Sequence, residues 1–190
     1  MSDMIDWLEK QYCQTDMTVK ICEPNPQAVD HLKSIYQIDE ESFMGNILLH
    51  TGGIVVENWL RIYGSGQYDF ATKNEELSEF SSLIVAEDVT GGLFAQQSDG
   101  KIRYFSADGL EWEDLDISYN ELILFSTSPQ RMAMFYSHAR WEGWEQDLEQ
   151  LQPHEGVSYY PFLWSKESQD GFSTKIVPMA DIFELEKSFL

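Results

Sequence analysis

Cysteine is nearly absent from this sequence. Only Cys13 and Cys22 occur among its 190 residues, too few for the disulfide framework of a small secreted protein. No companion cysteine or histidine gives them the spacing of a zinc site, and the four histidines are scattered: His31, His50, His138 and His154. We therefore expect reduced thiols, no bound metal ion and no cofactor.

Basic residues are also scarce. The chain has 12 Lys and Arg against 33 Asp and Glu, a formal net charge of −21 at pH 7. The few cations are spread singly and form no basic stripe, which disfavours nucleic acid and anionic membranes as partners. A surface of this charge attracts basic proteins, cationic ligands and metal ions. We expect a basic protein as the partner; the sequence sets no oligomeric state.

Long apolar runs and targeting signals are missing as well. No run approaches the roughly 20 apolar residues needed to cross a bilayer, and the first ten residues lack the basic and apolar regions of a signal peptide. We therefore expect a cytoplasmic protein. The 43% hydrophobic and 14% aromatic content, with 12 Gly and 6 Pro, is that of a folded domain and excludes collagen-like or disordered chains.

The order of the periodic segments predicts an α+β fold. Residues 1–43 form a helical segment, residues 44–115 a sheet core, and residues 116–190 a mainly helical part with helices over 118–126, 129–138 and 141–151, extended segments at 159–164 and 175–177, and a final helix. We expect a central, mainly antiparallel sheet of about five to six strands, with N-terminal and C-terminal helices packed against it. Without repeats or linkers, residues 1–190 are predicted to be a single domain.

Catalytic and phosphate-binding motifs are not found. Gly64-Ser65-Gly66 and Gly91-Gly92 fit no phosphate loop, and no nucleophile elbow occurs, so we predict no catalytic residue. Four glycines are expected to serve positive φ or close backbone approach: Gly52, Gly53, Gly64 and Gly66. Arg61, in the apolar run 59–63, is expected to form an ion pair that joins the sheet to an acidic loop.

The acidic residues cluster near tryptophans. Alternation places Trp112 on the opposite side of a strand from Glu111 and Glu113, so we expect Trp112 to face the core. The cluster is either a solvated face or an anionic surface with aromatic anchors for a basic protein. In the second interpretation the partner-binding residues are Glu111, Trp112, Glu113, Asp114, Asp116, Glu142 and Glu145.

Two functions of different classes remain open. The first is a non-enzymatic acidic module that binds a basic protein. The alternative is a small-ligand, carbohydrate-like binder or a hydrolase that uses carboxylates in an aromatic cleft, formed for example by Trp112, Trp141, Trp144 and Tyr160. A pocket with convergent polar groups and a perturbed carboxylate would favour the alternative.

Several sequence blocks resemble those of an uncharacterised bacterial family. They are MGNILLHTGG (44–53), WLRIYGSG (59–66), GGLFA (91–95), YFSADGLEWEDL (104–115), FYSHARWEGWE (135–145) and YYPFLWSKE (159–167). More distantly, the order of elements and the acidity are similar to the SUKH superfamily, which includes Syd-like and toxin-immunity proteins. This resemblance implies an α+β fold and an immunity-like protein that neutralises a basic partner such as a toxin. It supplies no site residues.

Overall fold

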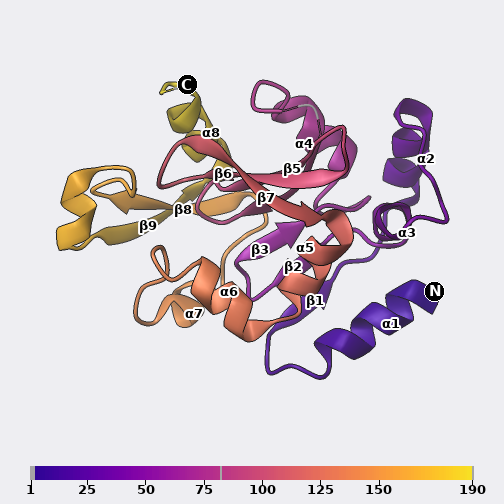
Figure 1. The fold of residues 1–190 in the computed structure, drawn as a ribbon, viewed down its shortest axis with the longest axis horizontal. Coiled ribbons are helices and arrows are strands. Elements are labelled where there is room, and N and C mark those ends of the chain that lie inside the picture. Colours follow the sequence, from indigo (N-terminus) through magenta and orange to yellow (C-terminus); the bar gives the residue numbers. More distant parts are fainter. Residues whose placement is uncertain (1–2, 82, 190) are drawn as a thin grey trace.

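The computed structural model describes residues 3–81 and 83–189 and has a seven-stranded antiparallel sheet at its centre (Figure 1). Each strand pairs with the next one in the sequence, so β1 and β7 lie at the edges. The strands are β1 (Val19–Ile21), β2 (Ile54–Val56), β3 (Leu60–Ile62), β4 (Ile84–Asp88), β5 (Leu93–Gln96), β6 (Lys101–Ser106) and β7 (Glu111–Ser118). The predicted α+β fold is confirmed. The sheet exceeds the expected five to six strands because short β1 extends it by pairing with β2.

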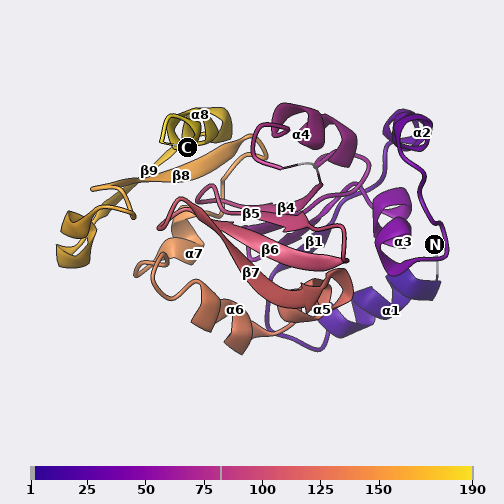
Figure 2. The same cartoon turned by 45° about the horizontal axis from the view of Figure 1, so that its top comes forward.

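Helices cover both sides of this sheet. Figure 2 shows α4 and α8 on one side and α5 and α6 on the other. None of the helices in the described residues is long and apolar enough to cross a membrane. The helices are α1 (Asp3–Tyr12), α2 (Pro26–Ile35), α3 (Phe43–His50), α4 (Phe70–Glu76), α5 (Tyr119–Ser126), α6 (Pro129–Phe135), α7 (Trp144–Asp147) and α8 (Met179–Lys187).

Side-chain caps fix where several helices begin. Asn25 accepts hydrogen bonds from the backbone N–H groups of Gln27 and Ala28 at the start of α2. At α5, the Ser118 side chain and the Glu121 carboxylate cap each other's backbone N–H groups in a capping box. These short polar residues satisfy donors that a helix terminus leaves free, so the helix starts are encoded locally.

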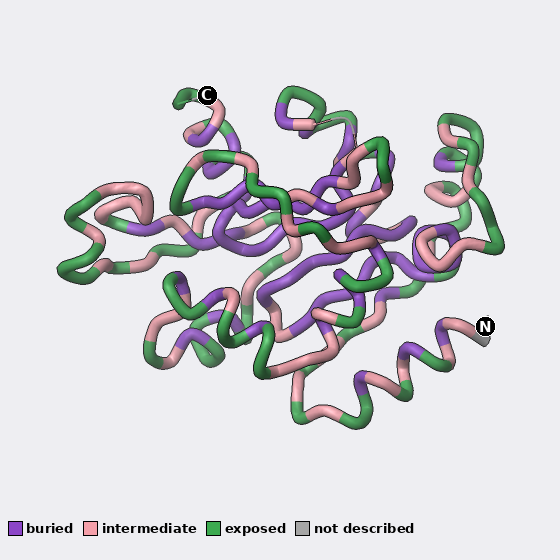
Figure 3. Tube along the Cα trace, in the orientation of Figure 1, coloured by how far each residue is buried: buried purple, intermediate pink, exposed green. Residues whose placement is uncertain are grey.

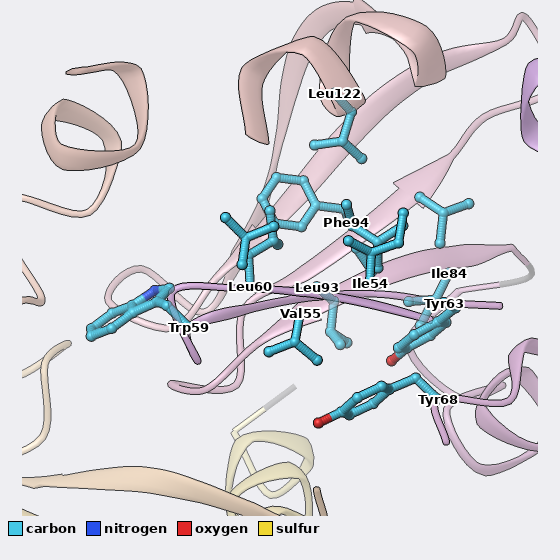
Figure 4. Close-up of a cluster of buried hydrophobic side chains, with 14 of the residues drawn as sticks. Ile54, Val55, Trp59, Leu60, Tyr63, Tyr68, Ile84, Leu93, Phe94 and Leu122 are labelled. Carbon is cyan, nitrogen blue, oxygen red and sulfur yellow. The ribbon is translucent and has the colours of Figure 1, made fainter. Parts of the chain in front are cut away.

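The central strands are buried on both faces (Figure 3). In Figure 4, Leu60, Phe94 and Leu122 lie on one side of the sheet, and Val55 and Tyr68 lie on the other. Every residue of β2, β3 and β4 is buried, including the charged ones. A charged side chain in such a strand needs a partner within the protein, because water cannot reach it.

The C-terminal part is less helical than predicted. The expected helix over residues 141–151 is a single turn, α7, because Gly143 has a left-handed φ of 84° and interrupts the helical path. Beyond it, β8 (Glu155–Tyr160) and β9 (Ser173–Pro178) form an antiparallel hairpin, which contains a short 3₁₀ helix (Lys166–Asp170) in its connection. Of the two predicted extended segments, 175–177 lies within β9, whereas only residues 159 and 160 of 159–164 belong to β8.

The hairpin is attached to the turn between β4 and β5. The Val157 N–H donates to the Val89 carbonyl at 2.6 Å, and the Met179 N–H donates to the His154 carbonyl at 2.8 Å. Buried apolar residues form one cluster that extends from Ile5 to Phe183. That residues 1–190 form a single domain stays a prediction.

Candidate functional site

A cavity of about 340 Å³ lies between α8, β8 and the turn that joins β4 to β5. We call it the α8 pocket. Its wall is largely aliphatic, with three aromatic residues from the hairpin: Tyr159, Phe162 and Trp164. The polar residues of the wall are Thr90, Ser158, Asp181 and Glu186. The cavity volume and this mixture of many apolar and few polar groups are typical of a small-molecule site.

Glu186 is the unusual group of the α8 pocket. Helix α8 places it in the wall with no exposed surface, and neither of its carboxyl oxygens has a hydrogen-bond partner in the described part of the chain. The carboxyl group packs against Gly91, where an added Cβ would overlap Glu186 Oε1. Burial, reinforced by the negative charge of Asp88, raises the pKa of Glu186 well above its ordinary value and favours the neutral form.

Asp88, at the end of β4, is equally buried but has partners. The Tyr104 hydroxyl donates to Asp88 Oδ2 at 2.7 Å. The backbone N–H of Thr90 donates to Asp88 Oδ1 at 2.9 Å, its hydroxyl donates at 2.6 Å, and the Gly92 N–H donates at 3.1 Å. Four donors thus satisfy both carboxyl oxygens of Asp88. Two neighbouring buried acids therefore have different environments, a difference that often marks functional sites.

Arg61 lies in a second buried cluster, on the other face of the sheet from Asp88. Its guanidinium forms an ion pair with Glu87 at 3.4 Å, and Glu87 also contacts Lys73 at 3.0 Å and accepts a hydrogen bond from Tyr63 at 2.8 Å. Burial would raise the pKa of Glu87, but the charges of Lys73 and Arg61 outweigh it and hold that pKa below its usual value. The partner of Arg61 is thus on the adjacent strand β4, not in an acidic loop, because β4 continues through Asp88.

The same arginine holds one wall of the α8 pocket in place. Arg61 donates to the backbone carbonyls of Gln152, at 3.3 Å, and Glu155, at 2.6 Å. These carbonyls lie at and just before the start of β8, whose residues 157–159 line the cavity. The sheet core and the pocket wall are therefore connected by a buried, charge-assisted contact.

The four predicted structural glycines lie together where two segments cross. Gly53 has a left-handed φ of 111°, and a Cβ on Gly64 would meet the backbone of Gly53 and Thr51. A Cβ on Gly66 would come within 2.6 Å of the Gly52 Cα. None of the four lines the α8 pocket. Their role in this geometry is close backbone approach.

The predicted partner-binding residues of β7 lie along one edge strand. Trp112 is half-buried, with the Arg103 guanidinium 4.3 Å from its ring centroid and the Phe105 ring 5.5 Å away. One of the acids, Asp116, forms an exposed ion pair with Lys101 at 3.0 Å. The exposed acids of the strand are Glu111, Glu113, Asp114 and Asp116.

Glu142, just before α7, and Glu145, within it, are exposed, whereas Trp144 is buried with the Arg140 guanidinium 4.0 Å from its ring centroid. Within residues 3–81 and 83–189, no cation forms ion pairs with both these two glutamates and the acids of β7. The acidic residues also form no group of three or more ligands placed for a metal ion there.

The sequence prediction omits Glu186, which lines the pocket, and Asp88, whose charge acts on Glu186. The signal for Glu186 is present in the final helix, since it follows Ile182 by four residues and precedes Phe189 by three. These residues share a helix face, so a carboxyl group falls on an apolar stripe. The pocket itself has no local signal, because its wall comes from segments far apart in the sequence.

Comparison with known proteins gives a family but no activity. A family described as "Protein of unknown function DUF2625" matches residues 2–182. The chain is 30% identical over 163 residues to "Putative uncharacterized protein YbfG" of Escherichia coli, covering 79% of the chain and 74% of that protein. It is 33% identical over 144 residues to an "Uncharacterized protein" of Haemophilus influenzae, covering 67% of the chain and 63% of that protein. No solved structure matches the chain significantly, and the resemblance to the SUKH superfamily stays a prediction.

Proposed function

The chain belongs to the DUF2625 family of proteins of unknown function, and we propose that it is a non-enzymatic binding protein whose α8 pocket holds a small, largely apolar ligand. The observation that carries this proposal is Glu186, whose carboxyl group has no hydrogen-bond partner among the described residues and lies in the wall of a 340 Å³ apolar cavity. A buried polar group left without a hydrogen bond costs about 1–3 kcal/mol. A ligand that supplies a partner for it recovers that free energy on binding.

The composition of the wall supports an apolar ligand over a carbohydrate. The many hydroxyl groups of a sugar need hydrogen-bond partners when they are buried, whereas the polar wall residues in the described part of the chain are Thr90, Ser158, Asp181 and Glu186. A ligand with one polar end and a hydrophobic body matches this distribution. The proposal thus takes the small-ligand alternative and replaces its carbohydrate-like form.

A fragment screen with a matched pair of variants tests this proposal. Neutral, anionic and cationic fragments with one aromatic or alkyl group are screened by thermal shift and isothermal titration calorimetry. Ser158→Trp fills the cavity from β8, while Ser173→Trp adds the same side chain on β9, outside the lining. We expect at least one fragment class to bind the wild type and Ser173→Trp but not Ser158→Trp. Absence of binding in all classes, or binding that survives Ser158→Trp, would overturn it.

A second candidate function is docking of a basic protein, in the immunity-like manner that the distant resemblance implies. The specific observation that favours it is the position of β7. This strand pairs only with β6 among the described residues, and four of its acids are exposed. An outer strand offers backbone hydrogen-bonding groups to an extended segment, and its acids select a basic one.

Charge reversal distinguishes this docking from nonspecific attraction. Glu111→Lys, Glu113→Lys, Asp114→Lys and Asp116→Lys are combined in one variant. The control variant reverses four exposed acids elsewhere: Asp30, Glu41, Glu75 and Asp170. We expect one basic protein, identified from lysate and then purified, to bind the wild type and the control but not the β7 variant. Equal loss in both variants would show that only net charge matters.

A further inference from the structure

We infer that the ligand of the α8 pocket is a small organic cation, an amine head on an apolar body, with the ammonium group placed at Glu186. This inference rests on the proposed function and names the chemistry of its ligand. It is carried by three features of the wall: the sign of its charges, its aromatic residues and the unpartnered carboxyl group.

The charges of the described wall residues have a single sign. The ionisable acids of the wall are Asp181, which is exposed, and Glu186, which is buried. No Lys, Arg or His belongs to the lining in the described part of the chain. The adjacent Lys187 is held by Glu79 at 2.7 Å and lies over the Phe80 ring, and neither Glu79 nor Phe80 lines the pocket. A carboxylate or phosphate ligand would therefore find two acids and no cation, whereas an ammonium finds a partner.

The aromatic residues favour a cation as well. Phe162 and Trp164 stack with ring centroids 4.6 Å apart, and Trp164 contacts Phe189 at 5.5 Å. Tyr159 donates its hydroxyl to the Ala139 carbonyl, which fixes its ring in the wall. Rings held near a cavity stabilise ammonium groups through their π faces, and they also pack against an apolar body.

Binding of an ammonium ion changes the proton balance of the pocket. Groups that face Glu186 or act on it are Asp88, with Tyr104 and Tyr136 around it, Asp181 on the same helix and Tyr159 on β8. None of these supplies a positive charge. Burial favours the protonated Glu186 carboxyl group before binding; an R–NH₃⁺ ligand replaces that proton, forms the ion pair, and the proton leaves to solvent.

A matched trio of probes tests the inference: 2-phenylethylamine, 2-phenylethanol and phenylacetate. Affinities are measured by isothermal titration calorimetry between about pH 6 and about pH 8, in two buffers with different ionisation enthalpies. We expect the amine to bind at least about tenfold more tightly than the alcohol at the upper pH. Its affinity should rise with pH, with close to one proton released per amine bound, and phenylacetate should bind weakest.

Variants of α8 test whether the preference for the amine and the proton release depend on Glu186. Glu186→Gln is expected to lose the preference for the amine and the proton release, while it retains binding of the alcohol. Glu184→Gln, on the exposed face of the same helix, is expected to behave as the wild type. If Glu186→Gln does not fold, proton release by the wild type still decides the question.

The outcomes separate this inference from the proposed function. Equal affinities for the three probes, tighter binding of phenylacetate, or amine binding without proton release would overturn the cation assignment and leave the pocket as a ligand site. Binding of other fragments but not of the amine would likewise overturn the cation assignment and leave the pocket as a ligand site. Failure of all three probes and of every fragment class would overturn the proposed function itself.

Discussion

At the scale of single residues, Glu186 is expected to reduce the stability of the unliganded protein. Its pKa is raised in the folded state, so the folded protein holds a proton that the unfolded chain releases above its ordinary pKa. Stability is therefore lost as pH rises through the window between the unfolded and folded pKa values. Within this window the free energy of unfolding falls by at most about 1.4 kcal/mol per pH unit.

Glu186→Gln tests this linkage directly. The amide stays neutral, so we expect its free energy of unfolding to exceed that of the wild type by about 1–3 kcal/mol at neutral pH, with the difference vanishing near the ordinary glutamate pKa of 4.5. Urea unfolding followed by circular dichroism between about pH 5 and about pH 8 measures it. Glu184→Gln is the control. A difference that does not change with pH would show that Glu186 is ionised in the fold.

At the scale of elements, the turn between β4 and β5 is shaped to accept α8. Gly91 in this turn has a φ of 101°, and its missing side chain leaves room for the Glu186 carboxyl group and for Ile182. Gly100, in the turn between β5 and β6, has a similar φ of 83°, but a Cβ added there would have no heavy atom within 4 Å. The two glycines share a backbone requirement and differ only in what surrounds them.

We expect Gly91→Ala to destabilise the protein more than Gly100→Ala. Both substitutions place alanine at positive φ, at a cost of about 1 kcal/mol. Gly91→Ala adds overlap with α8, which costs a further 1–3 kcal/mol, on the order found for overpacked sites. Urea unfolding gives the loss in free energy of unfolding for each variant. Amide hydrogen exchange in α8 should become faster in Gly91→Ala and stay unchanged in Gly100→Ala. Equal costs would mean that α8 moves freely away from the turn.

The elements also show what sequence reasoning reaches. The strands of the sheet follow from runs of β-branched and aromatic residues and from the Asp99-Gly100 turn, which are local signals. Helix α4 carries no clear apolar periodicity, and α7 is shortened by Gly143. The hairpin that closes the pocket depends on contacts such as Arg61 with the Glu155 carbonyl. Such contacts join residues far apart in the sequence, and no local pattern contains them.

At the scale of the whole molecule, three of the cations compensate buried or partly buried acids, and Lys33, Lys101 and Lys187 pair with exposed ones. Arg61 and Lys73 are committed to Glu87, and Arg140 pairs with Glu57 at 2.7 Å. Most of the remaining acids are exposed and have no cation beside them. The net charge of −21 is therefore largely a property of the surface. This negative charge attracts cationic ligands toward the protein, but repulsion among the surface carboxylates also destabilises the folded state.

This self-repulsion predicts stabilisation by salt. Raising NaCl from about 10 mM to about 300 mM shortens the screening length from about 30 Å to below 10 Å, so we expect the unfolding temperature at pH 7 to rise by a few degrees. A variant with glutamine at Glu111, Glu113, Glu142 and Glu145 has a net charge of −21 + 4 = −17. It should unfold at a higher temperature than the wild type in low salt and respond less to NaCl. Calorimetry measures the unfolding temperatures of the wild type and the variant at both salt concentrations. If the unfolding temperature instead falls with NaCl, ion pairs such as Arg140–Glu57 stabilise the fold by more than surface repulsion destabilises it.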